Sequence, residues 1–127
     1  MAGAPLPSRL TLNSDTGIAM YGVNNATGGN AIGVFDPKTE RITEWKVPTP
    51  WSAPYDVVAD RNGDAWTGSM LTDRVARLDI KSGQYTEYML PRSTNIRRVY
   101  VDDSKSPGTL WIGSNHGASI VKLEPLD

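Results

Sequence analysis

The feature that most constrains this chain is an internal repeat of about 43 residues. The segment Ile32–Asp36 aligns with Val75–Asp79, and both segments end in an aspartate. At the same spacing, Thr43–Trp45 aligns with Thr86–Tyr88. A third copy begins at Ile120. Repeats of this period are typical of propellers and solenoids, so the chain is built from copies of one small unit.

Each copy contains four short segments that are rich in β-branched and aromatic residues and are separated by turn-forming residues. In the best-defined copy these segments are Tyr55–Ala59, Ala65–Ser69, Arg74–Asp79 and Gln84–Leu90. Asn62-Gly63 joins the first two segments, and this dipeptide is a strong hairpin signal. No long stretch has the periodicity of a helix. The pattern predicts an all-β fold of four-stranded antiparallel β-propeller blades. Hairpins of a sandwich or barrel are the alternative, although a sandwich rarely repeats its sequence.

Two recurring positions predict a core residue between blades and a turn residue in the left-handed conformation. The second segment contains Trp66 in one copy and Trp111 in the next, and Met20 has the equivalent place near the front of the chain. A large apolar residue at one fixed position predicts a core between adjacent blades. The turn before the fourth segment ends in Gly83 in one copy and in Glu40 in another. Glu40 is therefore expected in the left-handed conformation, at a cost of roughly 1 kcal/mol.

The length of 127 residues accommodates three blades, of which the last is incomplete. Blade 1 is expected at about residues 9–48, blade 2 at about 54–91, and blade 3 at about 96–127 without its fourth strand. Propellers close with about four to eight blades, so three blades alone would expose apolar faces and an open edge. We therefore expect a homodimer that forms a six-bladed ring, with residues 1–8 as a candidate strand-exchange tail. The alternative is that the chain is a piece of a longer propeller.

Charge and composition exclude several classes of function. Thirteen Lys and Arg residues against fourteen Asp and Glu residues leave a net charge of −1, without the basic excess of a nucleic-acid or anionic-membrane surface. The absence of Cys excludes disulfides, zinc-thiolate sites and thiol nucleophiles. No apolar run approaches the length of a membrane-spanning helix. Residues 1–7 lack the basic and apolar regions of a signal peptide, so a cytoplasmic location is the default expectation.

Several segments resemble the repeats of a known group of proteins, namely Ile32–Pro37, Thr43–Trp45 with Val47-Pro48, Pro54–Asp60, Asn62–Trp66 and Ser114–Gly117. They are similar to streptogramin B lyase-like (virginiamycin B lyase-like) bacterial propellers, and NHL-type propellers look alike. The resemblance covers roughly residues 17–127 and implies a ring of six or seven blades. For a true lyase, it implies a magnesium-assisted elimination that opens a cyclic depsipeptide antibiotic at its ester linkage. In that chemistry a His acts as general base and acidic residues hold Mg²⁺.

The resemblance directs attention to His116, the single histidine, in the loop Gly113–Gly117. Its intrinsic pKa suits a general base, although a lone His in a polar loop is also an ordinary surface residue. The family pattern has a Glu near the base, whereas the neighbours here are Ser114 and Asn115. Asp73, in the corresponding loop of the preceding copy, is the candidate metal ligand. A pair of carboxylates suited to Mg²⁺ is not evident.

Other candidates for ligand binding lie where the first strand of a blade begins, because innermost strands face the central channel. They are Tyr55 and Asp56 in one copy and Arg97 and Arg98 in the next, together with Asn115 in the loop near the histidine. An ion pair between Asp56 and Arg98 across the blades is the structural alternative. We therefore expect a propeller module that binds a small ligand or a partner through its channel or loops. The alternatives are a Mg²⁺-dependent C–O lyase and a remnant of a longer gene, since fold alone does not transfer chemistry.

Overall fold

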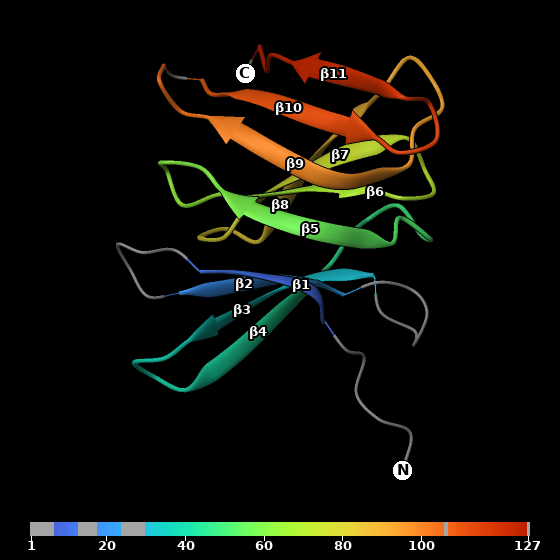
Figure 1. Cartoon of the computed structure of the whole chain (residues 1–127). Helices are drawn as coiled ribbons and strands as arrows, with labels where there is room; N and C mark the ends of the chain where they lie inside the picture. Colours follow the sequence, from blue (N-terminus) through green and yellow to red (C-terminus); the bar gives the residue numbers. More distant parts are fainter. Residues whose placement is uncertain (1–6, 13–17, 24–29, 106, 127) are drawn as a thin grey trace.

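Short runs of apolar and β-branched residues between tight turns form eleven strands in the computed structural model (Figure 1). The structure describes residues 7–12, 18–23, 30–105 and 107–126. The first sheet contains β1 (Pro7–Leu12), β2 (Ala19–Val23), β3 (Ala31–Asp36) and β4 (Arg41–Lys46). The second sheet contains β5 (Pro54–Ala59), β6 (Ala65–Ser69), β7 (Arg74–Asp79) and β8 (Gln84–Met89). The third sheet contains β9 (Ile96–Asp102), β10 (Thr109–Ser114) and β11 (Ser119–Leu123).

Each sheet is an antiparallel meander in which consecutive strands pair. The residues described contain no helix, and so none that could cross a membrane. This architecture confirms the predicted all-β fold of four-stranded antiparallel blades. We call the three sheets blade 1, blade 2 and blade 3 in chain order. Blade 3 has three strands in the described part of the chain, and β11 is its outer edge.

The blades follow one another along the arc, with their first strands side by side (Figure 1). β5 contacts both β1 and β2 of the preceding blade, and β9 contacts both β5 and β6. The turn Asp79–Gly83 has Gly83 at φ 74°, and the equivalent Glu40 has φ 55°. Glu40 therefore adopts the left-handed conformation that its position in the repeat predicts.

The core between blades 1 and 2 is formed by opposing sheet faces. Blade 1 contributes Met20, Ile32 and Val34, and blade 2 contributes Val57, Ala65 and Leu78. At the outer strands, the hydroxyl of Tyr85 donates a hydrogen bond of 2.6 Å to the backbone oxygen of Trp45. Apolar burial and this polar contact together hold the outer strand of blade 2 against that of blade 1.

The core between blades 2 and 3 has the same construction with larger side chains. Trp66, Val75 and Leu90 face Ile96, Val99, Leu110 and Ile112 across the contact. The indole of Trp66 donates to Asp60 at 2.9 Å and stacks on Tyr88, with ring centroids 5.7 Å apart. The predicted inter-blade role is confirmed for Trp66 and Met20. For Trp111 it stays a prediction, because the described residues include no blade that could cover that face.

A glycine on the second strand of blade 1, and another on that of blade 2, sets how closely the next blade approaches. A Cβ at Gly22 would lie 2.8 Å from the backbone oxygen of Pro54, and a Cβ at Gly68 would lie 2.1 Å from Cγ2 of Ile96. Pro54 and Ile96 each begin the first strand of the following blade. Only a residue without a side chain therefore fits at these two positions.

A methyl group at Gly68 is expected to separate blade 3 from blade 2. Gly68→Ala should lower the free energy of unfolding by about 1–3 kcal/mol, because the new Cβ overlaps Ile96. Chemical denaturation measures the loss, and Ile96→Ala supplies the second arm of a double-mutant cycle. In the Ile96→Ala background the same change at Gly68 should cost less, because the overlapping Cγ2 is gone. Equal costs in the two backgrounds would contradict the close approach.

Alkaline pH is expected to weaken the structure through its buried tyrosines. Burial raises the pKa of Tyr85, and burial with a hydrogen bond to Glu44 raises the pKa of Tyr21 to about 12. The unfolded chain releases these protons first, near pH ~10, so the folded state loses stability as the pH rises further. Melting temperatures measured across this range should fall in the wild type and fall less in Tyr85→Phe. An equal fall in both proteins would exclude a contribution from Tyr85.

Candidate functional site

The first pair of predicted site residues lies at the start of β5. Tyr55 is half-buried, whereas Asp56 is buried, with 4% of its surface exposed. The carboxylate of Asp56 accepts a hydrogen bond of 3.2 Å from the backbone N–H of Val99, and its backbone oxygen accepts one of 2.7 Å from Thr67. Asp56 therefore connects the first strands of blades 2 and 3.

The second pair, Arg97 and Arg98, is exposed at the start of β9. Neither arginine belongs to an ion pair within the described part of the chain, so the alternative of an Asp56–Arg98 pair is not realised. Arg98 is opposite Gly113 in the register of the sheet and lines a hollow on the face of blade 3 that is turned away from blade 2. The two guanidinium groups are therefore available to solvent or to a ligand.

His116 and Asn115 lie in the turn between β10 and β11, and both are exposed. The backbone N–H of Asn115 donates to the backbone oxygen of Asn95 at 2.9 Å. No hydrogen bond or ion pair holds the imidazole of His116 among the residues described. A general base is normally oriented by a second group, and His116 has no such group in this part of the chain.

Asp73 has a structural partner in the connection between β8 and β9. Its carboxylate accepts hydrogen bonds from the backbone N–H of Thr94 at 2.7 Å and from the hydroxyl of Thr94 at 3.3 Å. Its backbone oxygen accepts another from the N–H of Leu90 at 2.9 Å. The loops of Asp73 and Asn115 thus both bond to this connection, at the consecutive residues Thr94 and Asn95.

The donor set for a divalent cation does not assemble around these residues. Three or more His, Asp or Glu side chains do not gather anywhere in residues 7–12, 18–23, 30–105 and 107–126. Mg²⁺ requires several oxygen ligands in octahedral geometry, and Asp73 already accepts hydrogen bonds through one of its carboxylate oxygens. The described residues therefore do not fit the magnesium site that the resemblance implies.

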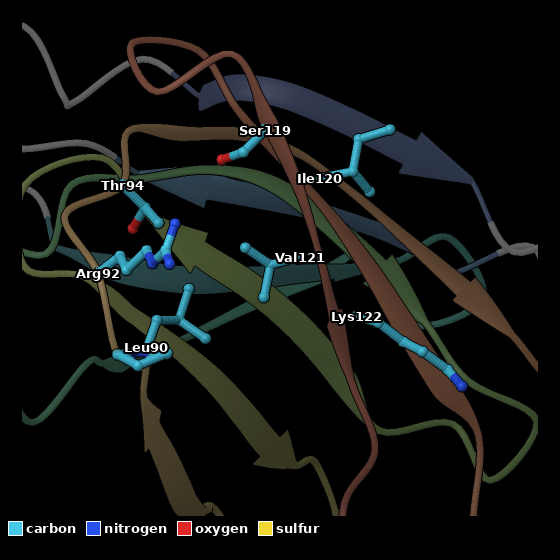
Figure 2. Close-up of a pocket in the computed structure, with 8 residues that line it drawn as sticks. Leu90, Arg92, Thr94, Ser119, Ile120, Val121 and Lys122 are labelled. Carbon is cyan, nitrogen blue, oxygen red and sulfur yellow. The ribbon is translucent and has the colours of Figure 1, made fainter.

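A hollow of about 310 Å³ lies beside the edge strand β11. One wall is the connection that carries Leu90, Arg92 and Thr94, and the other is β11. Figure 2 shows Ser119 and Val121 on the side of this connection, whereas Ile120 and Lys122 point to the other side. Apolar, hydroxyl and guanidinium groups therefore line one groove along a strand that has a partner on one side only in the described structure.

The outer face of blade 3 exposes the residues that blade 2 buries at equivalent positions. Trp111 is 40% exposed and Ile120 is 77% exposed, whereas their equivalents Trp66 and Val75 are 3% and 0% exposed. Tyr100 pairs with Trp111 across the strands and is also exposed. Exposed apolar clusters of this kind are often found at contact surfaces.

The opposite end of the arc exposes apolar residues as well. On the face of blade 1 that is turned away from blade 2, the register places Leu12, Ala19, Phe35 and Ile42 in one row. Leu12 and Ile42 are exposed, and Phe35 is half-buried. The equivalent row of blade 2, which includes the buried Leu78, forms part of the core against blade 1. Each end of the arc therefore exposes an apolar sheet face, and the equivalent faces within the arc are buried between blades.

The sequence interpretation missed Arg92 and Thr94 as groove residues. A signal was present, because Arg92 follows Leu90-Pro91 as Thr49 follows Val47-Pro48 in the preceding copy. It also missed Gly113, which occupies the blade 3 position of Gly22 and Gly68. A Cβ at Gly113 would meet no atom within 4 Å. Comparison of equivalent positions in the three copies therefore also indicates which residues a neighbouring blade should cover.

No protein-family model and no curated protein matches the chain. Among solved structures it is similar to virginiamycin B lyase from Staphylococcus aureus, with 28% identity and a TM-score of 0.69. A catalytically inactive variant of that lyase with quinupristin has 28% identity and a TM-score of 0.70. A streptogramin B lyase structure has 24% identity and a TM-score of 0.72.

Each of these three matches covers 92% of this chain but only 40% of the lyase chain. The likeness therefore extends over nearly all of the present arc and over less than half of each lyase. It confirms the resemblance to streptogramin B lyase propellers and a β-propeller-like fold with partial blades.

Substitution of Asp73 and of His116 is expected to have different effects on stability. Asp73→Ala should lower the free energy of unfolding by about 1–2 kcal/mol, because the N–H of Thr94 loses its acceptor. His116→Ala, at an exposed position, should change it by less than about 0.5 kcal/mol. Chemical denaturation with and without Mg²⁺ tests both variants. Stabilisation of the wild type by Mg²⁺ that Asp73→Ala abolishes would instead assign Asp73 to a metal site.

Proposed function

We propose that this chain is a propeller-building module, a three-blade arc that joins a second copy through its end faces to form a six-bladed ring. The observation that carries this proposal is the space over Gly113. At Gly68 the same position is filled by Ile96 of the following blade, whereas a Cβ at Gly113 would meet nothing within 4 Å. Blade 3 thus has space for the first strand of a further blade, and the face around this space is apolar and exposed.

Blade 1 of a second copy supplies a face of the matching type. Within the arc, blade 2 covers Met20 and Ile32 of blade 1 with the row that contains Ala65 and Leu78. The equivalent row of blade 1 contains the exposed Leu12 and Ile42. Head-to-tail contacts of this kind form a closed ring when the rotation completes a circle, and a ring of about six blades lies in the range that propellers adopt.

The assembled ring would bind a small polar or anionic ligand, or a partner protein, at its channel and loops. Arg97 supports this part of the proposal, because it is exposed and lacks an ion-pair partner in the described structure, whereas Arg98 is opposite Gly113 on the face that the second copy would cover. The exposed Asn115 and His116 add hydrogen-bonding groups on a neighbouring loop. A twofold ring would present each of these groups twice.

Lyase activity is the second candidate, and the likeness to virginiamycin B lyase favours it. The residue that would act as base is His116. The described residues do not gather ligands for Mg²⁺, so we assign no step to a metal here. Incubation with quinupristin and Mg²⁺, followed by chromatography, tests this candidate. Loss of the intact compound that depends on His116 would establish it, and an unchanged compound would exclude it for this substrate.

Self-association should depend on the space over Gly113. Sedimentation of the wild type should give twice the monomer mass of 13.8 kDa. Gly113→Leu should shift the protein to the monomer at the same concentration, because the leucine occupies the place of the incoming strand. The melting temperature extrapolated to low concentration should stay unchanged.

Lys81→Leu is the matched control, because it adds the same side chain on an exposed turn of blade 2. This variant should remain dimeric. A wild type that sediments as a monomer at every concentration, or a Gly113→Leu variant that stays dimeric, would overturn the proposal.

A further inference from the structure

We propose that β11 and its groove form an acceptor site for one extended strand with an acidic residue followed by an aromatic residue. The strand would come from a polypeptide segment outside this sequence. This inference goes beyond self-association, because it concerns a strand that pairs with the open edge of blade 3, and of the face around Gly113 it uses Trp111 alone. It rests on the groove of about 310 Å³, on the register of blade 2, and on the charge of Arg92.

Blade 2 serves as the template for this site. There, β8 pairs with β7 so that Glu87 is opposite Ala76 and Tyr88 is opposite Val75. Val75 in turn is opposite Gly68, as Ile120 is opposite Gly113 in blade 3. An incoming strand in the same register would therefore place its acidic residue opposite Val121 and its aromatic residue opposite Ile120.

The acidic residue of the strand is recognised from the preceding connection. In blade 2 the hydroxyl of Thr49 donates a hydrogen bond of 2.8 Å to Glu87. The residue at the equivalent place in the next connection is Arg92, which lines the groove beside Val121 (Figure 2). A guanidinium forms a stronger, charge-assisted hydrogen bond to a carboxylate than a hydroxyl does. Blade 3 therefore favours an acidic residue at this point more strongly than blade 2.

The aromatic residue of the strand is recognised on the other face. Tyr88 of β8 stacks on Trp66, with an angle of 18° between the rings. Trp111 has the place of Trp66 in blade 3 and is 40% exposed, with the amine of Lys122 5.8 Å from its ring centre. Adjacent residues of a strand point to opposite faces, so one strand can reach Arg92 with its acidic side chain and Trp111 with the next.

The backbone of β11 supplies the remaining affinity. An extended peptide that joins an open sheet edge gains main-chain hydrogen bonds, and pockets for alternate side chains determine its specificity. The chain contains the triplet Thr-Glu-aromatic twice, at Thr43–Trp45 and at Thr86–Tyr88. Both copies already pair within their own blades, as β4 and β8. The occupant is therefore a segment outside this sequence.

A synthetic peptide with the sequence of Gln84–Pro91, QYTEYMLP, is the probe for this site. It contains no tryptophan, so the indole fluorescence of the protein reports its binding. The wild type should bind it saturably, with one peptide per chain and weaker binding at high salt. The Glu87→Lys form of the peptide should bind at least about ten-fold more weakly, because its charge repels Arg92. A peptide of the same composition in scrambled order should not bind.

Charge reversal on the protein and on the peptide tests whether Arg92 recognises the acidic residue of the strand. The Arg92→Glu protein should prefer the Glu87→Lys peptide over the original peptide, which reverses the order seen with the wild type. Lys38→Glu makes the same change in net charge on an exposed turn of blade 1 and should leave the wild-type preference intact. The Trp111→Ala protein, altered at a partly exposed position, should fold normally and bind the original peptide roughly ten-fold more weakly.

Two results would overturn the acceptor site, namely a wild type that binds neither peptide and an Arg92→Glu protein with an unreversed preference. Gly113→Leu keeps this experiment separate from the test of self-association, because the variant leaves β11 and Arg92 in place. Peptide binding should persist in Gly113→Leu. A dimeric wild type that fails to bind the peptide refutes the acceptor site alone, and a monomeric wild type that binds it refutes the ring alone.

Discussion

The structure depends on one constraint, that a sheet with apolar residues on both faces must be covered on both faces. Blade 2 meets this requirement completely, and its residues Ala65, Val75 and Leu78 are fully buried between two neighbours. Blades 1 and 3 meet it on one side only, which leaves Leu12 and Trp111 exposed at the two ends. The proposed assembly and the proposed strand acceptor both follow from this difference between the middle blade and the outer two.

Much of the fold could be predicted from the sequence because the relevant signals are local and recur. Short segments rich in β-branched and aromatic residues indicated the strands, and Asn62-Gly63 indicated the hairpin between β5 and β6. Comparison of Glu40 with Gly83 predicted a left-handed residue, since equivalent turns share their backbone conformation. The recurrence of a large apolar residue at one position of the second strand also identified Trp66 as part of the core between blades. Each of these inferences used only neighbours in the chain or the same position in another copy.

The candidate site could not be predicted in the same way, because its partners come from other blades. The carboxylate of Asp56 accepts a hydrogen bond from the backbone of Val99 and does not pair with the nearby Arg98. The strand register is irregular at the start of β5 and of β9, so position in the repeat does not tell which of these two residues Asp56 meets. Asp73 meets Thr94, a residue without an outstanding sequence signal. The exposure of Trp111 depends on which blades are present, and its local sequence closely resembles that of the buried Trp66. Side-chain type alone therefore does not reveal which contacts these residues make.

The glycines of the second strands also have a geometric consequence for the proposed ring. Near the axis, Gly22 and Gly68 bring successive blades together, whereas Trp45, Tyr85 and Tyr88 fill the space between the outer strands. Each blade is therefore a wedge, thin at its inner edge and thick at its rim. The volume of the side chains at the rim, relative to that near the axis, sets the angle that one blade subtends. Changes in these few residues would thus alter the curvature of the arc, and with it the number of wedges that complete a circle.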